Sequence, residues 1–554
     1  MKNIFTVAAQ TFSQCLRMKI AVSCIMLLVI ALAAVGFMGQ GDGTLAGRIR
    51  TCMNYSLGLT GMLLSVVTIF AIVSVVTEDV RQKFVMVLAV KPLARYQYML
   101  GRWLGVVMLN AVLLAIAGLS TYVLLQHLRN LPAVNSADRQ AVETEIFTAR
   151  QELAPVPPDI QMLFDKKIEQ LQKEGRYNSI LQEFLIQSGD NADQAKLKMQ
   201  KELEKEILAW IEFVPANGQK LYQFRGLALK DQAVDGNGRV EIAEIKDGLF
   251  RINAPTRLIS KMFYNGPVQI NGIRGRIIRM EQTFFDVVFE PRDMQRSELQ
   301  NLKKNAEVAI IVEPTIQFRY KVKIAGKSSS ASELFRAIAF LDSNKKPNGV
   351  LIMGEGPVNT VTTINAPAIG LGEGDFYVVY ANVPKPAQSV MSVSAPAIPL
   401  IIPMNDVRVL YRVGGFEANF FRALLLILFQ LAFLAALGVF CSSFLAFPVA
   451  SLACFALLGC GLLVNWVSES LSWGKTAGGF DFVNFMGSLV VEILRALMPN
   501  LGSTSPAEKL VDGKVLSWVA VGVTFIKVVI VRTFIYLAMG CLIYNKRELA
   551  KVQV

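Results

Sequence analysis

The sequence has 554 residues, of which 53% are hydrophobic and 18% charged, with a mean hydropathy of +0.42, which excludes an ordinary soluble globular protein. The net charge of +13 could indicate nucleic-acid binding, but residues 126–417 are nearly balanced, with 36 Lys and Arg against 34 Asp and Glu. The basic excess therefore lies beside the apolar segments, where it marks the cytoplasmic side of a membrane protein. We expect a chain in contact with membrane lipid and no nucleic-acid partner.

The first 20 residues carry an apolar stripe at helical spacing, which includes Ile4, Phe5, Ala8 and Phe12. This stripe predicts a helix lying in the membrane interface before the first span. The stretch "ALAAVG" at 31–36 resembles a signal-peptide cleavage site. The segment before it is amphipathic rather than a short basic leader, so we expect an uncleaved N-terminus.

Six stretches approach the roughly 20 apolar residues that a membrane-crossing helix needs. They are 20–38, 55–77, 103–125, 420–440, 447–466 and 528–544. Lys and Arg gather before the first span, between the second and third, and after the sixth. This bias predicts a multi-pass protein with both termini in the cytoplasm and residues 126–417 outside it.

The segment 78–102, between the second and third spans, is basic and aromatic but begins with the acids Glu78 and Asp79. Lys91-Pro92 predicts a turn between an amphipathic segment and a second short helix that runs into the third span. Phe84, Leu88, Leu93, Tyr96 and Tyr98 offer an apolar surface. Such a compact element can transmit force from a cytoplasmic partner into two spans, whereas the simpler alternative is a cytoplasmic loop that only follows the charge rule.

The insert at 126–417 divides by composition into two parts. Residues 126–215 predict a helical region, because apolar positions recur among alternating Lys and Glu. Residues 216–413 predict a β-rich module, because "IQFRYKVKI" (316–324), "FYVVYANV" (376–383) and "DVRVLYRV" (406–413) alternate with a period of two or form short apolar runs. "GEGP" (354–357), "GLGEGD" (370–375) and "VPKP" are expected as joints between strands. The predicted fold class is a membrane α-helical bundle with six transmembrane helices and an α+β extracytoplasmic insert containing a β-sandwich or jelly-roll-like module.

The chain shows no convincing catalytic, nucleotide-binding or metal-binding motif. All seven cysteines lie in or near the spans, the only histidine is His127, and "WGKTAGG" (473–479) lacks the first glycine of a phosphate-binding loop. We therefore expect no enzymatic activity, no catalytic residues and no metal site. Lys527 and Arg532 lie at the predicted outer end of the sixth span, where they either reach the interface or line a polar cavity for a substrate.

Glu78, Pro92, Arg95, Gly101, Arg102 and Gly105 follow the order "acid, P-x-x-R, G-K/R-x-x-G". With this order, blocks 1–125 and 414–554 resemble the permease subunits of ABC-2-type ABC transporters, particularly the branch like the copper-enzyme-maturation permeases, whose ATPase is encoded separately. The N-terminal helix resembles the elbow helix of that family, and "YNKREL" (544–549) resembles its cytoplasmic ending. Residues 484–499 resemble its external re-entrant helices. The insert is much larger than simple permeases carry, so the resemblance names no substrate.

The resemblance implies a permease subunit in the plasma (inner) membrane of a bacterium, as half of a homodimer or heterodimer. A cytoplasmic ABC ATPase subunit would be its partner and would bind ATP and Mg, so no cofactor is expected in this chain. The residues expected to couple to that ATPase are Glu78, Phe84, Lys91, Pro92, Arg95, Tyr98, Gly101 and Arg102. The transporter would drive export or move its extracytoplasmic domain.

A second hypothesis is a receptor or scaffold that transports nothing. In it the spans only anchor the external β-rich module, which binds a ligand of the cell envelope. The size of the insert, more than half of the chain, is the observation behind this alternative.

Overall fold

The computed structural model divides into two compact units, residues 1–149 with 414–554 and residues 150–413. The residues that the structure describes are 2–18, 41–81, 94–187, 192–228, 241–246, 249–253, 267–270, 273–280, 284–289, 310–312, 315–325, 333–368, 374–384, 398–473 and 506–546, with isolated residues at 23–35, 371 and 486–494. The second unit lies within the predicted insert, whose residues 126–149 belong to the first unit.

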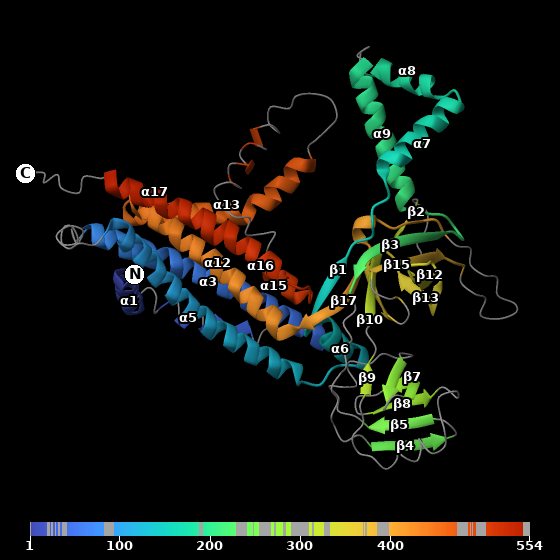
Figure 1. Ribbon diagram of the computed structural model, residues 1–554, viewed down its shortest axis with the longest axis horizontal. Helices are drawn as coiled ribbons and strands as arrows, with labels where there is room; N and C mark the ends of the chain where they lie inside the picture. Colours follow the sequence, from blue (N-terminus) through green and yellow to red (C-terminus); the bar gives the residue numbers. More distant parts are fainter. Residues whose placement is uncertain are drawn as a thin grey trace, which may run out of the picture. The chain divides into compact units, whose positions relative to one another are not determined.

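The first unit is a helical bundle in which α3, α5 and α12 lie side by side and α1 packs on α5 (Figure 1). Its helices are α1 (Lys2–Arg17), α3 (Leu45–Arg81), α5 (Arg95–Arg129), α6 (Ser136–Ala141), η1 (Val142–Ile146), α12 (Phe416–Ser442), α13 (Phe447–Trp473), α15 (Pro506–Val511), α16 (Trp518–Thr524), η3 (Phe525–Arg532) and α17 (Thr533–Lys546). The segments η1 and η3 are π-helical. One apolar core joins α3, α5 and α12.

Within the described part of this bundle, four helices are long and apolar enough to cross a membrane: Leu45–Asp79, Arg95–Arg129, Phe416–Ser442 and Trp518–Ile543. They contain the second, third, fourth and sixth predicted spans, and the last of them begins at Trp518 rather than at 528. The fifth predicted span falls on α13, in which the residues with described side chains form an apolar helix over Phe447–Leu463. Most of the first predicted span and of the predicted external helices at 484–499 lies outside the described residues.

Side chains of residues 129–145 link the N-terminal end of α3 to the C-terminal end of α5. Asp138 of α6 caps α3, because its carboxylate accepts hydrogen bonds from the backbone N–H groups of Leu45 and Ala46, each at 2.9 Å. Such a cap satisfies orphan donors of a helix N-terminus. Arg129 at the end of α5 pairs with the buried Glu143 of η1, at 2.9 Å from its Nε to Oε1. Arg50 of α3 pairs with Glu145 at 2.5 Å.

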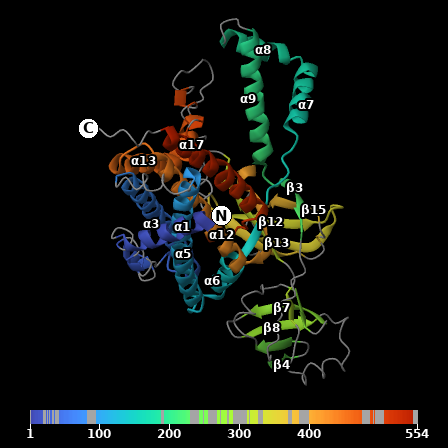
Figure 2. The ribbon, with the colours of Figure 1, turned by 60° about the vertical axis from the view of Figure 1, so that its left-hand side comes forward.

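The second unit begins with three helices, α7 (Ile160–Lys173), α8 (Tyr177–Gln187) and α9 (Ala192–Glu212), which lie together in Figures 1 and 2. Asp159 caps α7 by accepting a hydrogen bond from the N–H of Met162 at 3.1 Å. A small apolar core of Phe164 and Leu171 from α7 with Met199, Leu203, Ile207 and Ile211 from α9 holds the helices together. The predicted helical region is therefore helical over most of its length.

Two four-stranded sheets of the second unit enclose one aromatic core, called here the two-sheet core. The first has the order β1-β17-β10-β14 and the second β13-β12-β15-β3, and a short sheet β11-β16-β2 accompanies them. Phe318 of the first sheet lies 6.5 Å from Phe224 and 6.4 Å from Phe340 of the second, between ring centroids. The strands are β1 (Thr148–Leu153), β2 (Phe213–Val214), β3 (Gln219–Leu227), β10 (Thr315–Lys321), β11 (Lys323–Ile324), β12 (Glu333–Leu341), β13 (Pro347–Pro357), β14 (Val361–Pro367), β15 (Gly374–Asn382), β16 (Leu400–Ile401) and β17 (Arg408–Gly415), with a turn of 3-10 helix, η2 (Met404–Asp406).

A separate six-stranded sheet is inserted in the chain between β3 and β10, with the order β4-β5-β8-β7-β6-β9 (Figure 2). Its described neighbours pair antiparallel. Its strands are β4 (Glu241–Lys246), β5 (Leu249–Asn253), β6 (Pro267–Ile270), β7 (Ile273–Met280), β8 (Phe284–Phe289) and β9 (Ile310–Val312). The β-rich part thus contains two sheet bodies rather than one.

The alternating segments predicted as strands are confirmed as β10 with β11, β15 and β17, whereas two local expectations are wrong. Thr148–Leu153 lies in the region predicted as helical but forms β1, because pairing beside β17 overrides its weak local preference. "GEGP" was expected as a joint but ends β13, where Gly354 pairs with Arg336 and Gly356 with Leu334. Glycine in a strand commonly marks a close approach of another group, and at Gly356 that group is the guanidinium of Arg336.

Lys220 of β3 gives the two-sheet core a pH dependence. Its ammonium donates to the carbonyl of Ile211 and lies 5.5 Å from the ring centroid of Tyr222. Burial lowers the pKa of Lys220 to about 8, while the negative charge of Glu212 opposes this shift. The unfolded chain then binds more protons than the folded one between pH 8 and about 10.4, so stability should rise with pH across that window.

We expect the melting temperature of the wild-type chain, measured relative to Lys220→Met, to be level from pH 6 to 7.5 and to rise between pH 8 and pH 10. Differential scanning calorimetry of the full chain in lipid nanodiscs measures it. Lys205→Met, at a side chain of α9 that is 74% exposed, is the control. An equal wild-type–K220M difference at pH 7.5 and pH 10 would contradict the role of Lys220.

Candidate functional site: a buried ionic joint beside a polar pocket

Arg102 of α5 is the centre of a polar cluster at the end of the bundle where α1 lies. Its side chain is only 2% exposed, and its guanidinium pairs with the carboxylate of Asp79, near the end of α3, at 2.5 Å. The guanidinium also donates to the side-chain oxygens of Gln14 at 2.9 Å and Thr11 at 3.1 Å, both on α1. One arginine therefore binds three helices to each other.

Tyr98 lies one turn before Arg102 on α5 and completes the cluster. Its hydroxyl donates to the carboxylate of Asp79, and the guanidinium carbon of Arg102 lies 5.3 Å from the centroid of its ring. Residues four apart on a helix share a face, which is why both reach the same carboxylate. We call Thr11, Gln14, Asp79, Tyr98 and Arg102 the ionic joint.

Two glycines allow α1 to approach α5 closely enough for the ionic joint to form. A Cβ atom at Gly101 would lie 2.6 Å from the Cβ of Val7, and one at Gly105 would lie 2.6 Å from the carbonyl oxygen of Ala8. Side chains at these positions would push the two helices apart. In the "G-R-x-x-G" motif the glycines thus provide the contact surface for α1, and the arginine provides the polar link.

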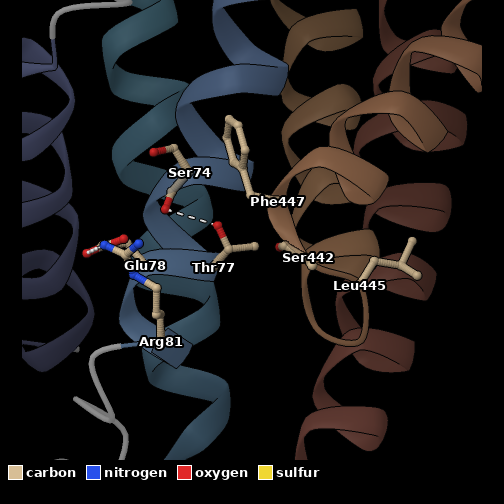
Figure 3. Close-up of a pocket in the computed structure, with 8 residues that line it drawn as sticks. Ser74, Thr77, Glu78, Arg81, Ser442, Leu445 and Phe447 are labelled. Atoms are coloured by element: carbon tan, nitrogen blue, oxygen red, sulfur yellow. Dashed lines mark hydrogen bonds and ion pairs between the residues drawn. The ribbon is translucent and has the colours of Figure 1, made fainter.

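A polar pocket of about 480 Å³ lies between the end of α3 and the turn from α12 to α13 (Figure 3). It is lined by Ser74, Thr77, Glu78 and Arg81 of α3, by Ser442 of α12, by Leu445 and Ala446 of the following turn, and by Phe447 of α13. Glu78 pairs with Arg81 at 2.9 Å, and the arginine is 79% exposed. Because successive residues of a helix point in directions about 100° apart, Glu78 faces the pocket while Asp79 faces the ionic joint.

The structure assigns different environments to the residues predicted to couple to an ATPase. Tyr98, Gly101 and Arg102 are buried between helices, Glu78 lines the pocket, and Arg95 is exposed in the first turn of α5. Phe84, Lys91 and Pro92 lie outside the described residues. The described members of the predicted set are therefore divided between buried positions among the helices and exposed positions.

Lys527 and Arg532 both belong to the π-helical segment η3 within the last candidate span. Lys527 is exposed from the protein and lies about two and a half turns beyond Trp518, so it does not flank the helix end. Arg532 is half-buried. π-helical turns are frequent at functional sites, and the hydroxyl of Thr533 donates to the carbonyl of Val528 at 3.1 Å beside this one.

Sequence reasoning did not identify Asp79, Thr11 and Gln14 as members of the site. Asp79 enters the sequence analysis only as a neighbour of Glu78, and no role is predicted for the polar positions of the N-terminal helix. The spacing of Thr11 and Gln14, three residues apart, places them on one helix face and could have indicated a shared partner. The turn at 443–446 carries no signal of a pocket.

No family model matches this sequence, and no curated protein matches it as a relative. Within the described residues, no group of three or more His, Cys, Asp or Glu side chains could hold a metal ion. The arrangement of the site itself therefore carries the functional argument.

Breaking the ionic joint should destabilise the bundle. Arg102→Met leaves Asp79 buried without its cation, which should lower the free energy of unfolding by about 3–5 kcal/mol. Asp79→Asn combined with Arg102→Met should restore much of that loss, because no buried charge remains. Unfolding by sodium dodecyl sulfate titration in mixed micelles measures both.

The matched control is Arg81→Met, which breaks the exposed pair with Glu78 and should cost about 0–1 kcal/mol. Equal losses for Arg81→Met and Arg102→Met would show that the buried pair has no special role.

Proposed function

We propose that this chain is the membrane-spanning permease subunit of an ATP-driven, ABC-2-type transporter in the plasma membrane of a bacterium. The observation that carries the proposal is the ionic joint, which links α1, α3 and α5 next to the segment 82–94 where an ATPase would bind. Both termini and this segment lie in the cytoplasm in the proposed orientation. Two ATPase subunits would supply ATP and Mg to the complex.

The ionic joint explains how force on a short segment would move several spans. A push on the first turn of α5 at Arg95 reaches Tyr98 and Arg102 within two turns. Because these side chains hold Asp79 of α3 and the polar groups of α1, the three helices move together rather than separately. Glu78 and Arg81, at the rim of the adjacent pocket, offer charged contacts to the partner.

At their other ends α3 and α5 are both linked to η1, by the Arg50–Glu145 and Arg129–Glu143 pairs. From there the chain continues through β1 and returns through β17, which are neighbours in one sheet. Tilting of α3 and α5 would therefore act on two paired strands at once. This supports coupling of ATP hydrolysis to movement of the second unit, which we place outside the cell and assign to the β-sandwich or jelly-roll-like class.

The last candidate span supports a permease dimer. Only 28% of its most apolar window is buried within the protein, against 50–67% for the other three candidate spans. Trp518, Val519, Ile526 and Phe534 are among its exposed apolar residues. Lipid or a second permease subunit, in a homodimer or heterodimer, would cover this surface.

The first test is purification of the tagged full chain from its native membrane in mild detergent, with mass spectrometry of the proteins that accompany it. We expect a stoichiometric ATP-binding subunit, and we expect its loss when Pro92 and Arg95 are both replaced by Ala. Arg225→Ala, which breaks an exposed pair with Asp375 in the second unit, should retain the subunit. Recovery of the chain without any ATPase would contradict the transporter proposal.

Lys527 and Arg532 are proposed to line a polar cavity used by the substrate. Lys527→Met and Arg532→Met should leave the amount of assembled complex unchanged and abolish export by the intact cell. Lys514→Met, at a side chain that is 31% exposed and lies outside the candidate span, is the control. Unchanged export in both variants would leave only a role at the membrane interface for the two side chains.

The second candidate function is a membrane-anchored receptor or scaffold, favoured by the separate cores and two sheet bodies of the second unit. Binding of a cell-envelope ligand to a soluble 130–413 fragment, together with no substrate moved by the intact complex, would support it.

A further inference from the structure

Arg336 of β12 is an arginine buried inside the two-sheet core. It is 5% exposed, and its guanidinium carbon lies 5.0 Å from the ring centroid of Tyr320 on the facing sheet. A Cβ atom at Gly356 of β13 would lie 1.4 Å from a terminal nitrogen of this guanidinium. The glycine therefore provides the space in which the charged group lies.

Among the described residues, no acidic side chain forms an ion pair with Arg336. Glu212 acts on the same end of the core, but its charge faces Lys220 and Tyr222. An arginine keeps its charge at any physiological pH. A buried charge without a counter-charge costs several kcal/mol, so this position needs an explanation.

Three tyrosine hydroxyls nearby are buried. Those of Tyr222 and Tyr320 make no hydrogen bond to the described part of the protein, whereas the oxygen of Tyr380 can accept one from the guanidinium of Arg336. Their side chains are at most 2% exposed, and the rings of Tyr320 and Tyr380 lie 5.5 Å apart between centroids. In the sheet Tyr222 pairs with Val378, two residues from Tyr380, so their side chains point to the same face. Burial raises the pKa of all three phenols, that of Tyr380 to about 12 although Arg336 opposes the shift, so all remain donors at neutral pH.

We propose that the two-sheet core binds one small monovalent anion of halide size, held by Arg336 and by the hydroxyls of Tyr320 and Tyr380, with Tyr222 beside them. Ordered water would accept the hydroxyl protons but would leave the guanidinium charge uncompensated. An anion accepts hydrogen bonds from the hydroxyls and also compensates the guanidinium charge. One negative charge matches the one positive charge of Arg336. The guanidinium can only donate, and each phenol has an O–H that can donate to an anion, as the groups of an anion site do.

This site is independent of the proposed transport function, because it lies in the second unit and uses none of the residues of the ionic joint. It gives the external module a ligand of its own. Chloride is the probe for solution experiments, and bromide is the probe for locating the anion.

The test follows the melting temperature of the full chain in lipid nanodiscs while sodium chloride replaces sodium gluconate at constant ionic strength. We expect the melting temperature to rise with chloride and to saturate. Tyr320→Phe, which removes one hydroxyl and nothing else, should weaken the apparent chloride affinity about tenfold, since a hydrogen bond to a charged group is involved. Arg336→Met should abolish the response.

Arg225→Met is the charge control, because Arg225 lies on β3 with a side chain that is 64% exposed, and it should respond to chloride like the wild type. Gly356→Ala should displace the guanidinium and remove the response, whereas Gly354→Ala in the same strand meets no atom within 4 Å and should keep it. If Arg336→Met does not fold, Tyr320→Phe and Gly356→Ala decide the question.

Anomalous diffraction from crystals grown in bromide should show a peak beside Arg336. The proposal is overturned if wild type melts identically in chloride and gluconate, if Arg225→Met and Tyr320→Phe lose the response equally, or if the bromide crystals show only water beside the guanidinium.

Discussion

The bundle depends on the Asp79–Arg102 pair, because both charges lie where water cannot solvate them. A buried carboxylate and guanidinium are acceptable only in direct contact, so α3 and α5 have one permitted register at this end. The remaining donors of Arg102 then bind Thr11 and Gln14 of α1, which also packs apolar side chains on α5. Such a pair contributes to the choice of one helix register rather than to the net free energy of folding.

The two units handle a buried arginine in opposite ways. In the first unit Arg102 has a carboxylate, a hydroxyl and an amide as partners, all supplied by the protein. In the second unit Arg336 meets the ring of Tyr320 and the neutral phenol of Tyr380, neither of which carries a negative charge. In the first arrangement the protein itself supplies the counter-charge, whereas in the second the proposed bound anion supplies it.

The sequence predicted elements well where one residue's environment follows from its neighbours along the chain. Alternation indicated β10, β15 and β17, and apolar length indicated α3, α5 and α12. It could not predict features that depend on residues far away in the sequence. The strand β1 forms through pairing with β17, and Gly356 suggests a turn unless its contact with Arg336 is known. For the same reason Glu78 and Asp79 looked equivalent, although it is Asp79 that pairs with Arg102 and Tyr98 of α5.

The cap of α3 has a consequence for biosynthesis. The carboxylate that satisfies the first backbone N–H groups of this helix belongs to Asp138, 93 residues after Leu45. During translation the start of α3 therefore lacks its acceptor until all of α5 has emerged from the ribosome. Asp138 is synthesised after both α3 and α5, so the insertion of α3 into the membrane precedes the capping of its N-terminus by Asp138.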